Sequence, residues 1–409
     1  DGDNLNYIHV LFEWEQEPDA VAYQIEISTD SNFSSIIVSQ IDSSLIYIEK
    51  EMIGWETTYY WRVCPIYIDG TYGEWIGTQI FSTGQTVISN DANTIIINED
   101  LIAEGLTIFG AFQDFYSAVI DKYGNEVWNS GNEQIIFYRT DNYGQLLGCK
   151  YSPGPTNPYM GVEFSIDADI VWNDPNDTFG HHDLVKMPSG NYLSMVTETE
   201  QYYVPCDLPY EFIESCINSG VYSPICYCEI PAFPWMGDRI VEWDKATGEE
   251  IWSWSVFDHF SFEDYELYNG TWFDAFYATP QRYDWTHANA LWFDESESAI
   301  YVSFRHLSRV SKIDYPSGNV IWSMGEDMPS GDVTFGHDLG FNYQHGVDIS
   351  NDGTILTLDN GNLTRVTRAL EILVTENNGE YSAEIVWEHP LRESLFGQFS
   401  GNVQKLDNG

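Results

Sequence analysis

Apolar and polar side chains alternate along much of this chain with the period of β-strands. The alternation is regular over residues 23–28, and further short apolar segments lie at residues 36–38, 45–48, 55–63 and 79–83. A period of two places successive side chains on opposite faces of a strand. Short strands with a turn signal about every eight to twelve residues are typical of a β-sandwich. We therefore predict one small β-sandwich over residues 1–84.

From about residue 85 onwards one pattern recurs: a strand, a turn, and a second strand that ends in Val-Trp or Ile-Trp. The copies end at Trp128, Trp172, Trp252, Trp322 and Trp387, so that they are 44, 80, 70 and 65 residues apart. A basic spacing near 44 residues, lengthened by insertions, is typical of the four-stranded blades of a β-propeller. We interpret the pattern as the outer pair of strands in each blade.

A second pattern places a histidine, or in one copy a glycine, near the start of a strand. The equivalent positions are His182, His287, His345 and Gly401. His182 and His345 each lie eight residues before a turn glycine. We interpret these segments as inner strands, whose starts surround the axis of a propeller. Side chains that are far apart in the sequence would then face one small pocket.

The predicted fold is all-β: a β-sandwich over residues 1–84, followed by a six-bladed β-propeller over residues 85–409. Five units end in tryptophan, and the segment from Gly401 begins a sixth blade that is incomplete in this chain. We expect this blade to be completed by sequence beyond Gly409 or by a strand from elsewhere in the chain.

The charge of the chain excludes some classes of partner. Its 16 Lys and Arg against 64 Asp and Glu give a net charge of −48, so nucleic acid and anionic membranes would be repelled. The sequence contains no run of 18 apolar residues, so no transmembrane helix is predicted. An acidic solvated surface suits a secreted, extracellular or periplasmic protein. Acidic turns such as residues 348–359 are weak candidates for Ca²⁺, because they lack the spacing of a dedicated loop.

Cysteines and glycosylation sequons also suggest an oxidising compartment. Four of the six cysteines lie in a Pro-rich insertion, residues 202–234, where disulfides are favoured over a zinc site because Cys226 and Cys228 are too close for zinc-ligand pairs. The sequons are at Asn32, Asn176, Asn269 and Asn362.

Both predicted domains resemble known families. The sandwich resembles a fibronectin type III domain, on Trp14, Tyr23, the strand at residues 59–63 and the closing residues 81–83. Roughly residues 100–409 resemble the bacterial arylsulfate sulfotransferases. This second resemblance is carried by residues 181–193, residues 284–289, Arg305-His306 and Gln344-His345.

The resemblance to arylsulfate sulfotransferases implies a site and a reaction. It implies a six-bladed propeller, exported from the cytoplasm, in which His345 takes a sulfuryl group from an aryl sulfate and passes it to a phenol. His287, Asn289 and Arg305 match positions that hold the sulfate oxygens. His182 matches the upstream active-site histidine, although the neighbouring His181 is an alternative. Neither a nucleotide sulfate donor nor a metal is implied.

The residue types themselves suit this chemistry. A neutral imidazole is a good nucleophile near neutral pH. A transferring sulfuryl group carries negative charge on three oxygens, which Arg305, Asn289 and a protonated His287 would stabilise. Aromatic-rich insertions at residues 202–235 and 257–283 are candidates for the wall of a phenol site. We expect His306 to point away, because it neighbours Arg305 on a strand.

Other interpretations remain open from sequence alone. The histidines and Asn289 could bond only to backbone groups, and Arg305 could pair with one of many carboxylates. A non-catalytic extracellular scaffold, binding protein or assembly subunit is the alternative function, and a homo-oligomer is compatible with it. A sulfate or phosphate ester hydrolase using the same site is a third interpretation.

Overall fold

The computed structural model describes residues 2–88, 94–112, 114–141, 144–151, 159–175, 180–205, 233–266, 268 and 270–406. These residues are almost entirely β-strands, turns and loops, which confirms the predicted all-β class. They form two compact units, one of residues 1–137 and 164–171 and one of residues 138–163 and 172–409. No described helix is long and apolar enough to cross a membrane.

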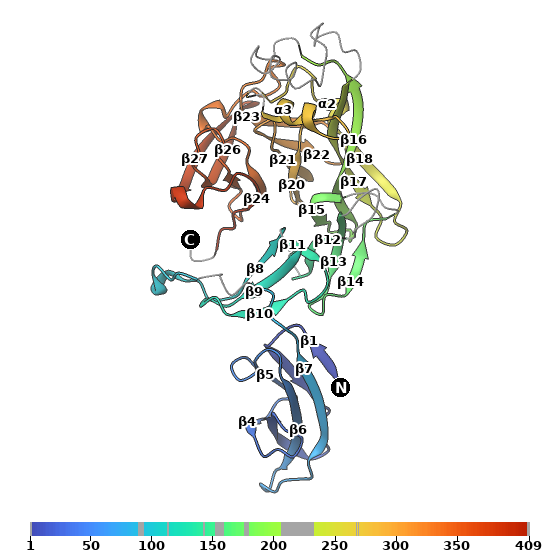
Figure 1. Ribbon diagram of the computed structural model, residues 1–409, viewed down its shortest axis with the longest axis vertical. Helices are drawn as coiled ribbons and strands as arrows, with labels where there is room; N and C mark the ends of the chain where they lie inside the picture. The colour runs from blue at the N-terminus through green and yellow to red at the C-terminus, as the bar shows by residue number, and fades with distance from the viewer. Residues whose placement is uncertain are drawn as a thin grey trace. The chain divides into compact units, whose positions relative to one another are not determined.

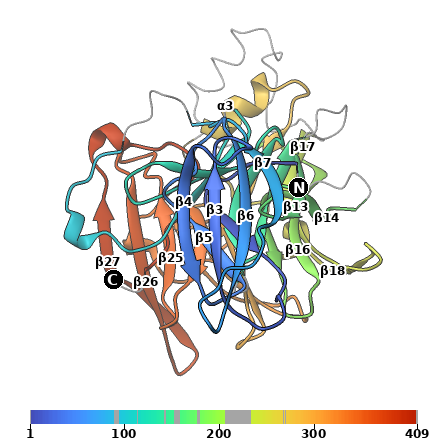
Figure 2. The same cartoon turned by 90° about the horizontal axis from the view of Figure 1, so that it is seen from below.

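The first unit begins with two sheets that enclose one core (Figure 2). The larger has the strand order β1-β7-β6-β3-β4 and the smaller pairs β2 with β5. The strands are β1 (Asp3–Leu5), β2 (Val10–Glu13), β3 (Ala20–Ser28), β4 (Ile36–Asp42), β5 (Ile46–Glu49), β6 (Thr58–Tyr67) and β7 (Ile76–Thr83). Alternate residues of β2 are buried, and the five predicted strand segments all fall on observed strands.

A three-stranded antiparallel sheet follows in the same unit, in the order β10-β9-β8. Its strands are β8 (Thr107–Ala111), β9 (Tyr116–Ile120) and β10 (Glu126–Asn129), preceded by the 3₁₀ turn η1 (Glu99–Leu101). Backbone hydrogen bonds join β10 to the N-terminal region, from Ile8 to Val127 and from Asn129 to Asn6. The predicted domain boundary after residue 84 stays a prediction.

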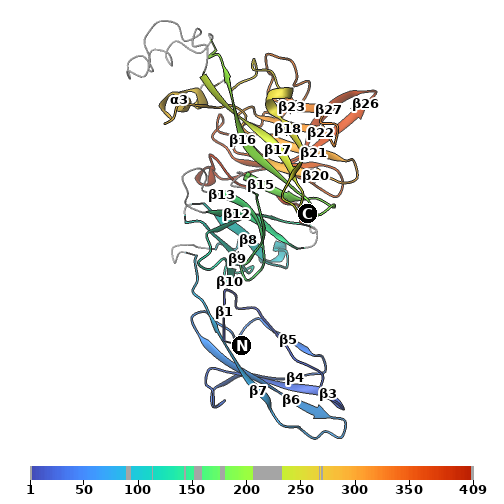
Figure 3. The same ribbon diagram turned by 90° about the vertical axis from the view of Figure 1, so that its right-hand side faces the viewer.

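The remaining sheets are antiparallel meanders in which each strand pairs with the next one along the chain. The first contains β11 (Ile135–Thr140), β12 (Leu146–Tyr151), β13 (Tyr159–Phe164) and β14 (Ile170–Asn173). The second contains β15 (Gly180–Lys186), β16 (Tyr192–Tyr202), β17 (Phe233–Trp243) and β18 (Glu250–Ser255), with the short β19 (Tyr283–Asp284) beside β17. Figure 3 shows the long hairpin of β16 and β17.

Two further four-stranded meanders complete the second unit. They contain β20 (Ala288–Asp294), β21 (Ala299–Phe304), β22 (Arg309–Asp314) and β23 (Val320–Gly325), and then β24 (His345–Ile349), β25 (Ile355–Asp359), β26 (Arg368–Asn377) and β27 (Glu380–Pro390). Short helical segments lie between the strands: α2 (Val256–His259), α3 (Gly270–Tyr277), η3 (His337–Leu339) and η4 (Glu393–Leu395).

Successive sheets pack face to face, so strands in the middle of the unit are buried on both sides. In β21, Ile300 and Val302 belong to the core shared with the preceding sheet, whereas Ala299 and Tyr301 belong to the core shared with the following sheet. All six residues of β21 are buried. The period of two therefore divides one strand between two cores.

All five repeated tryptophans lie in the last strand of a sheet. The indole N–H of Trp252 in β18 donates to the carbonyl of Pro316, in the turn between β22 and β23, over 2.8 Å. Trp128 in β10 donates in the same way to Ile166, in the turn between β13 and β14. In these two copies the tryptophan thus fastens one sheet to a turn of a later one.

Two of the six cysteines lie among the described residues. Cys64 and Cys149 are buried free thiols. The four cysteines of the insertion and the sequon residues Asn176 and Asn269 lie outside the described residues. The predicted disulfides therefore stay a prediction.

Candidate functional site

The first strands of three successive sheets, β15, β20 and β24, lie side by side in the second unit (Figure 1). Each pairs with the next strand through a register that shifts at its histidine end, between Gly180 and Leu184, between Ala288 and Ala290, and between His345 and Asp348. Such bulges turn side chains out of the regular alternation and are frequent beside active sites.

Left-handed backbone marks the same ends. His182 and His287 have φ values of 62° and 48°, which is unfavourable for a residue with a side chain. On β24 the left-handed position is taken by Gly346, with φ of 77°. The backbone at these strand ends therefore departs from regular β-pairing.

Three of the predicted histidines come together at these ends. The ring centroid of His182 lies 4.8 Å from that of His287 and 6.2 Å from that of His345. The neighbouring His181 instead places its Nε2 3.0 Å from Oδ1 of the buried Asp238. Of the two candidates left open by the sequence, His182 is therefore the one that faces both other histidines.

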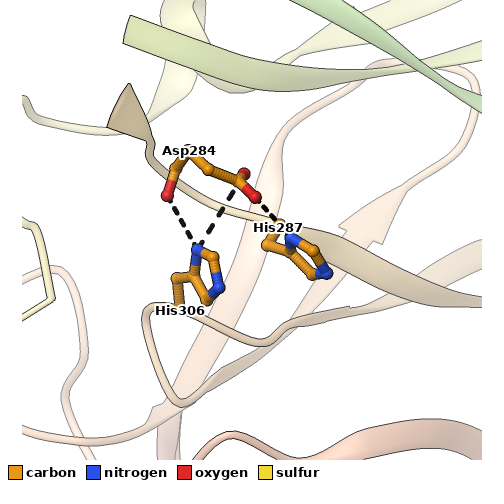
Figure 4. Close-up of side chains that lie close together, drawn as sticks. All are labelled: Asp284, His287 and His306. Carbon is orange, nitrogen blue, oxygen red and sulfur yellow. Dashed lines mark hydrogen bonds and ion pairs between the residues drawn. The ribbon is translucent and has the colours of Figure 1, made fainter. Parts of the chain in front are cut away.

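The carboxylate of Asp284 contacts the imidazole of His287 (Figure 4). Nδ1 of His287 lies 2.6 Å from Oδ2 of Asp284, three residues earlier in the chain. Burial alone would lower the pKa of His287, but the charge and hydrogen bond of Asp284 outweigh it and raise this pKa. The pKa of Asp284 is correspondingly lowered, against the effect of its own burial. The geometry thus favours a cationic imidazolium at His287.

His306 belongs to this cluster, and the prediction that it points away is wrong. Strand β21 ends at Phe304, so Arg305 and His306 lie in the following turn, where strand alternation does not apply. The ring of His306 lies 4.4 Å from that of His287, and its Nδ1 donates to the carbonyl of Asp284 over 2.7 Å. Burial lowers the pKa of His306 to about 3, so this ring is neutral.

His345 is buried, with 6% of its surface exposed, and its electrostatics are opposite to those of His287. Its Nδ1 lies 2.7 Å from Oδ1 of Asn360. Burial lowers its pKa to about 3, helped by the positive charges of Arg305 and His287 and opposed by the hydrogen bond to Asn360. At neutral pH the ring therefore keeps a nitrogen lone pair. The environments push two neighbouring histidines towards different protonation states, as in many acid–base sites.

The segment before His345 is fastened by a buried amide. Gln344 is fully buried, and its Nε2 donates to the Ser303 hydroxyl and to the Arg309 carbonyl, each over 3.0 Å. The Asn289 amide donates to the carbonyl of Gln344 over 2.7 Å. In the pair Gln344-His345, Gln344 therefore anchors the backbone and His345 belongs to the site.

Arg305 supplies a second positive group beside the histidines. Its Nη2 donates to the carbonyl of Gln398 over 3.0 Å, and its guanidinium lies 5.0 Å from the centre of the Tyr343 ring. Its buried Nε has no hydrogen-bond partner among the described residues. Burial lowers the pKa of Arg305, but from so high a value that the group stays charged at neutral pH. No carboxylate of the described residues forms an ion pair with it, so a cationic donor remains for an anion.

Three of these side chains also form a group of potential metal ligands. The donor atoms of Asp284, His287 and His306 lie within 4.8 Å of one another. However, Nδ1 of each histidine already makes a hydrogen bond of 2.6–2.7 Å to Asp284. A metal bound through these Nδ1 atoms would have to replace both bonds.

The described aromatic residues of the second insertion serve mainly as core. Trp272 and Tyr283 stack with centroids 3.7 Å apart, and both are fully buried together with Trp285. These three rings cannot wall an open phenol site. Most of the first insertion, residues 206–232, lies outside the described residues.

Comparisons with solved structures give only distant likenesses. A hydrazine synthase of Kuenenia stuttgartiensis is 11% identical over 94% of this chain and 97% of its own, with a TM-score of 0.34. The periplasmic gluconolactonase PpgL of Pseudomonas aeruginosa is 9% identical over 90% of this chain and 96% of its own, with a TM-score of 0.29. Identities and scores this low carry no argument about function.

An Fn3-like protein from Clostridium thermocellum is 19% identical over 20% of this chain and 92% of its own, with a TM-score of 0.17. No curated protein sequence matches the chain.

One family model does match, that of arylsulfotransferase (ASST), over residues 234–388. The matched segment runs from β17 to β27 and contains His287, Asn289, Arg305 and His345, whereas His181 and His182 lie before it. The resemblance drawn from the sequence is therefore confirmed over this part of the chain, where residues 234–388 match the arylsulfotransferase family model.

Proposed function

We propose that this protein transfers a sulfuryl group from an aryl sulfate ester to a phenolic acceptor by way of a sulfohistidine at His345. The family match supports aryl sulfotransferase activity. One observation supports the mechanism most directly. A neutral His345 lies in a buried cluster with two cationic groups, Arg305 and His287, which suits a nucleophile beside an anion-binding site.

In the first half-reaction the lone pair of His345 Nε2 attacks the sulfur of the aryl sulfate. The bond between sulfur and the aryl oxygen breaks, and its electron pair leaves with the phenolate. The phenolate takes the proton of His287, which becomes neutral, and the sulfuryl group stays on Nε2. Arg305, a protonated His287 and His182 stabilise the sulfuryl oxygens as charge moves onto the leaving oxygen.

In the second half-reaction the proton of a phenol passes to His287, which acts as a general base. The phenol oxygen attacks the sulfur, the bond between sulfur and Nε2 breaks, and its electron pair returns to His345. In this proposal Asn289 contributes its second amide hydrogen to a sulfuryl oxygen, and His181, held by Asp238, supports His182. Since the donor carries its own activated sulfuryl group, neither a nucleotide sulfate donor nor a metal takes part.

The wider setting follows from the sequence and the sheets. We propose that the five sheets from β8 to β27 are blades of a six-bladed propeller whose last blade begins near Gly401. The first 84 residues would be a fibronectin type III-like module. The acidic composition and the sequons support a secreted or periplasmic protein.

The assay is release of phenol from an aryl sulfate such as para-nitrophenyl sulfate, with and without a second phenol. We expect acceptor-stimulated release that falls at least about a thousandfold in His345→Ala, because the nucleophile is lost. His389→Ala removes an exposed histidine from β27 of the same sheet and should leave the rate unchanged. Release that ignores the acceptor would indicate a hydrolase. No release by folded protein would favour the scaffold.

A further inference from the structure

Asn360 is a fully buried amide immediately after β25, and its side chain makes three hydrogen bonds. Nδ2 lies 2.9 Å from the carbonyl oxygen of Gly397 and 3.1 Å from that of Ser400. Oδ1 lies 2.7 Å from Nδ1 of His345. Nothing in the sequence marks this residue, since Asp-Asn-Gly is an ordinary turn sequence.

These partners determine which way the amide is turned. Two carbonyl oxygens can only accept hydrogen bonds, so the NH₂ group of Asn360 must face them. The oxygen of the amide then faces His345, and an oxygen can only accept. The hydrogen of this bond must therefore be on Nδ1 of the imidazole.

We infer that Asn360 is a positioning residue that holds His345 as the Nδ1–H tautomer and so leaves the lone pair on Nε2. No described residue makes a hydrogen bond to that Nε2. This inference deepens the proposed function, because the tautomer decides which nitrogen attacks sulfur. In the opposite tautomer, Nε2 would carry the proton, and the Nδ1 lone pair would face the amide oxygen inside the protein.

The support of Asn360 extends into residues 397–400. Thr367 Oγ1 accepts from the backbone N–H of Gly397 over 2.9 Å and donates to the carbonyl of Asn360 over 3.1 Å. The carbonyl of Gln398, in the same segment, accepts from Arg305. Residues 397–400 therefore hold the amide that orients His345 and also the guanidinium beside it. Side-chain and backbone bonds of this kind fix the geometry of a reacting group.

The first test determines the tautomer without substrate. In protein labelled with ¹⁵N-histidine, the two ring nitrogens of His345 give different chemical shifts when protonated and unprotonated, and His345→Gln identifies its signals. We expect a neutral ring with Nδ1 protonated. A neutral ring with Nε2 protonated overturns the inference. This test measures no reaction. If the protein is inactive but His345 is the Nδ1–H tautomer, the proposed function is contradicted and this inference is supported.

The second test changes the amide. Asn360→Leu removes the acceptor at similar volume, so we expect His345 to move to the Nε2–H tautomer and kcat to fall by up to about ten-thousandfold, the loss that a wrong tautomer causes in a Ser-His-Asp triad. Asn360→Asp keeps the acceptor, so it should keep the Nδ1–H tautomer, raise the pKa of His345 by roughly 1–3, and restore part of kcat.

Asn377→Leu, the same change at the exposed end of β26, is the control. An Nδ1–H ring in Asn360→Leu, or equal loss of kcat in Asn360→Leu and Asn360→Asp, overturns the inference. Should Asn360→Leu fail to fold, the tautomer of the wild type and of Asn360→Asp still decides.

Discussion

Replacing Asp284 by Asn should move the charge state of His287 while leaving the shape of the site nearly unchanged. The carboxylate contacts His287 Nδ1 through Oδ2, and its backbone carbonyl, which holds His306, is retained in the variant. The substitution therefore tests whether His287 is cationic because of this one charge.

The size of the effect follows from the contact. Two unit charges 2.6 Å apart attract by about 6 kcal/mol at an effective dielectric constant of about 20, which is an upper bound. A neighbouring opposite charge typically changes a pKa by roughly 1–3, which corresponds to about 1.4–4 kcal/mol. Without the carboxylate, burial and Arg305 both lower the pKa of His287. We expect the pKa to fall by roughly 1–3, to below the ordinary value of 6.5.

The sign of the pH dependence follows. A proton on His287 is present below its pKa and is lost as pH rises through it, so activity that needs this proton should be lost at lower pH in the variant. The stability from the pair is present between the ordinary pKa of Asp, 3.8, and that of His, 6.5. It is lost as pH falls through the lowered pKa of Asp284 or rises through the raised pKa of His287.

The assay is a titration of His287 by NMR, together with the pH dependence of kcat/KM. Asp338→Asn removes one exposed carboxylate elsewhere and should change neither. An unchanged pKa of His287 in Asp284→Asn would refute the reasoning, since the raised pKa would then have another cause.

Three further substitutions test the supporting structure. Arg305→Lys keeps the charge but loses the planar fork, so kcat/KM should fall roughly tenfold to a hundredfold; wild-type kinetics would contradict the role given to the guanidinium. Asp264→Ala leaves the fully buried Arg309 unpaired and should lower the free energy of unfolding by about 3–5 kcal/mol in urea titrations, whereas a loss below 1 kcal/mol would show that water replaces the carboxylate. Gly346→Ala places a Cβ 3.2 Å from Asn402 on left-handed backbone, so it should cost about 1–2 kcal/mol in the same measurement; a neutral result would mean that β24 relaxes freely.

The repeating elements could be predicted from sequence because each copy repeats the same physical demand. A tryptophan in the last strand of a sheet reaches a turn of a later sheet in two copies, at Trp128 and Trp252, and every copy places its tryptophan in a last strand. The histidine positions were found in the same way, since His182, His287 and His345 occupy one frame relative to their strands. Their convergence followed from placing the strand starts around one axis.

The finer parts of the site could not be predicted, because they depend on departures from regular strands. The early end of β21 turns His306 towards the site, although strand alternation predicts the opposite. The bulges at the histidine ends leave no periodic signal. The pairing of β24 with β25 brings Asn360 near His345, but the direction of its amide depends on residues 397–400, which lie far along the chain. The contact between Asp284 and His287 could have been predicted, because the two residues are only three positions apart in the sequence.

The most direct test of the account is to look for the sulfuryl group on His345. The protein is mixed with a severalfold excess of aryl sulfate without acceptor, quenched in alkali, and analysed by tandem mass spectrometry. The account predicts a burst of phenol close to one per protein and a sulfuryl group on His345, which an added phenol removes as its sulfate ester. Phenol release without any adduct, or an adduct on a different residue, would contradict it.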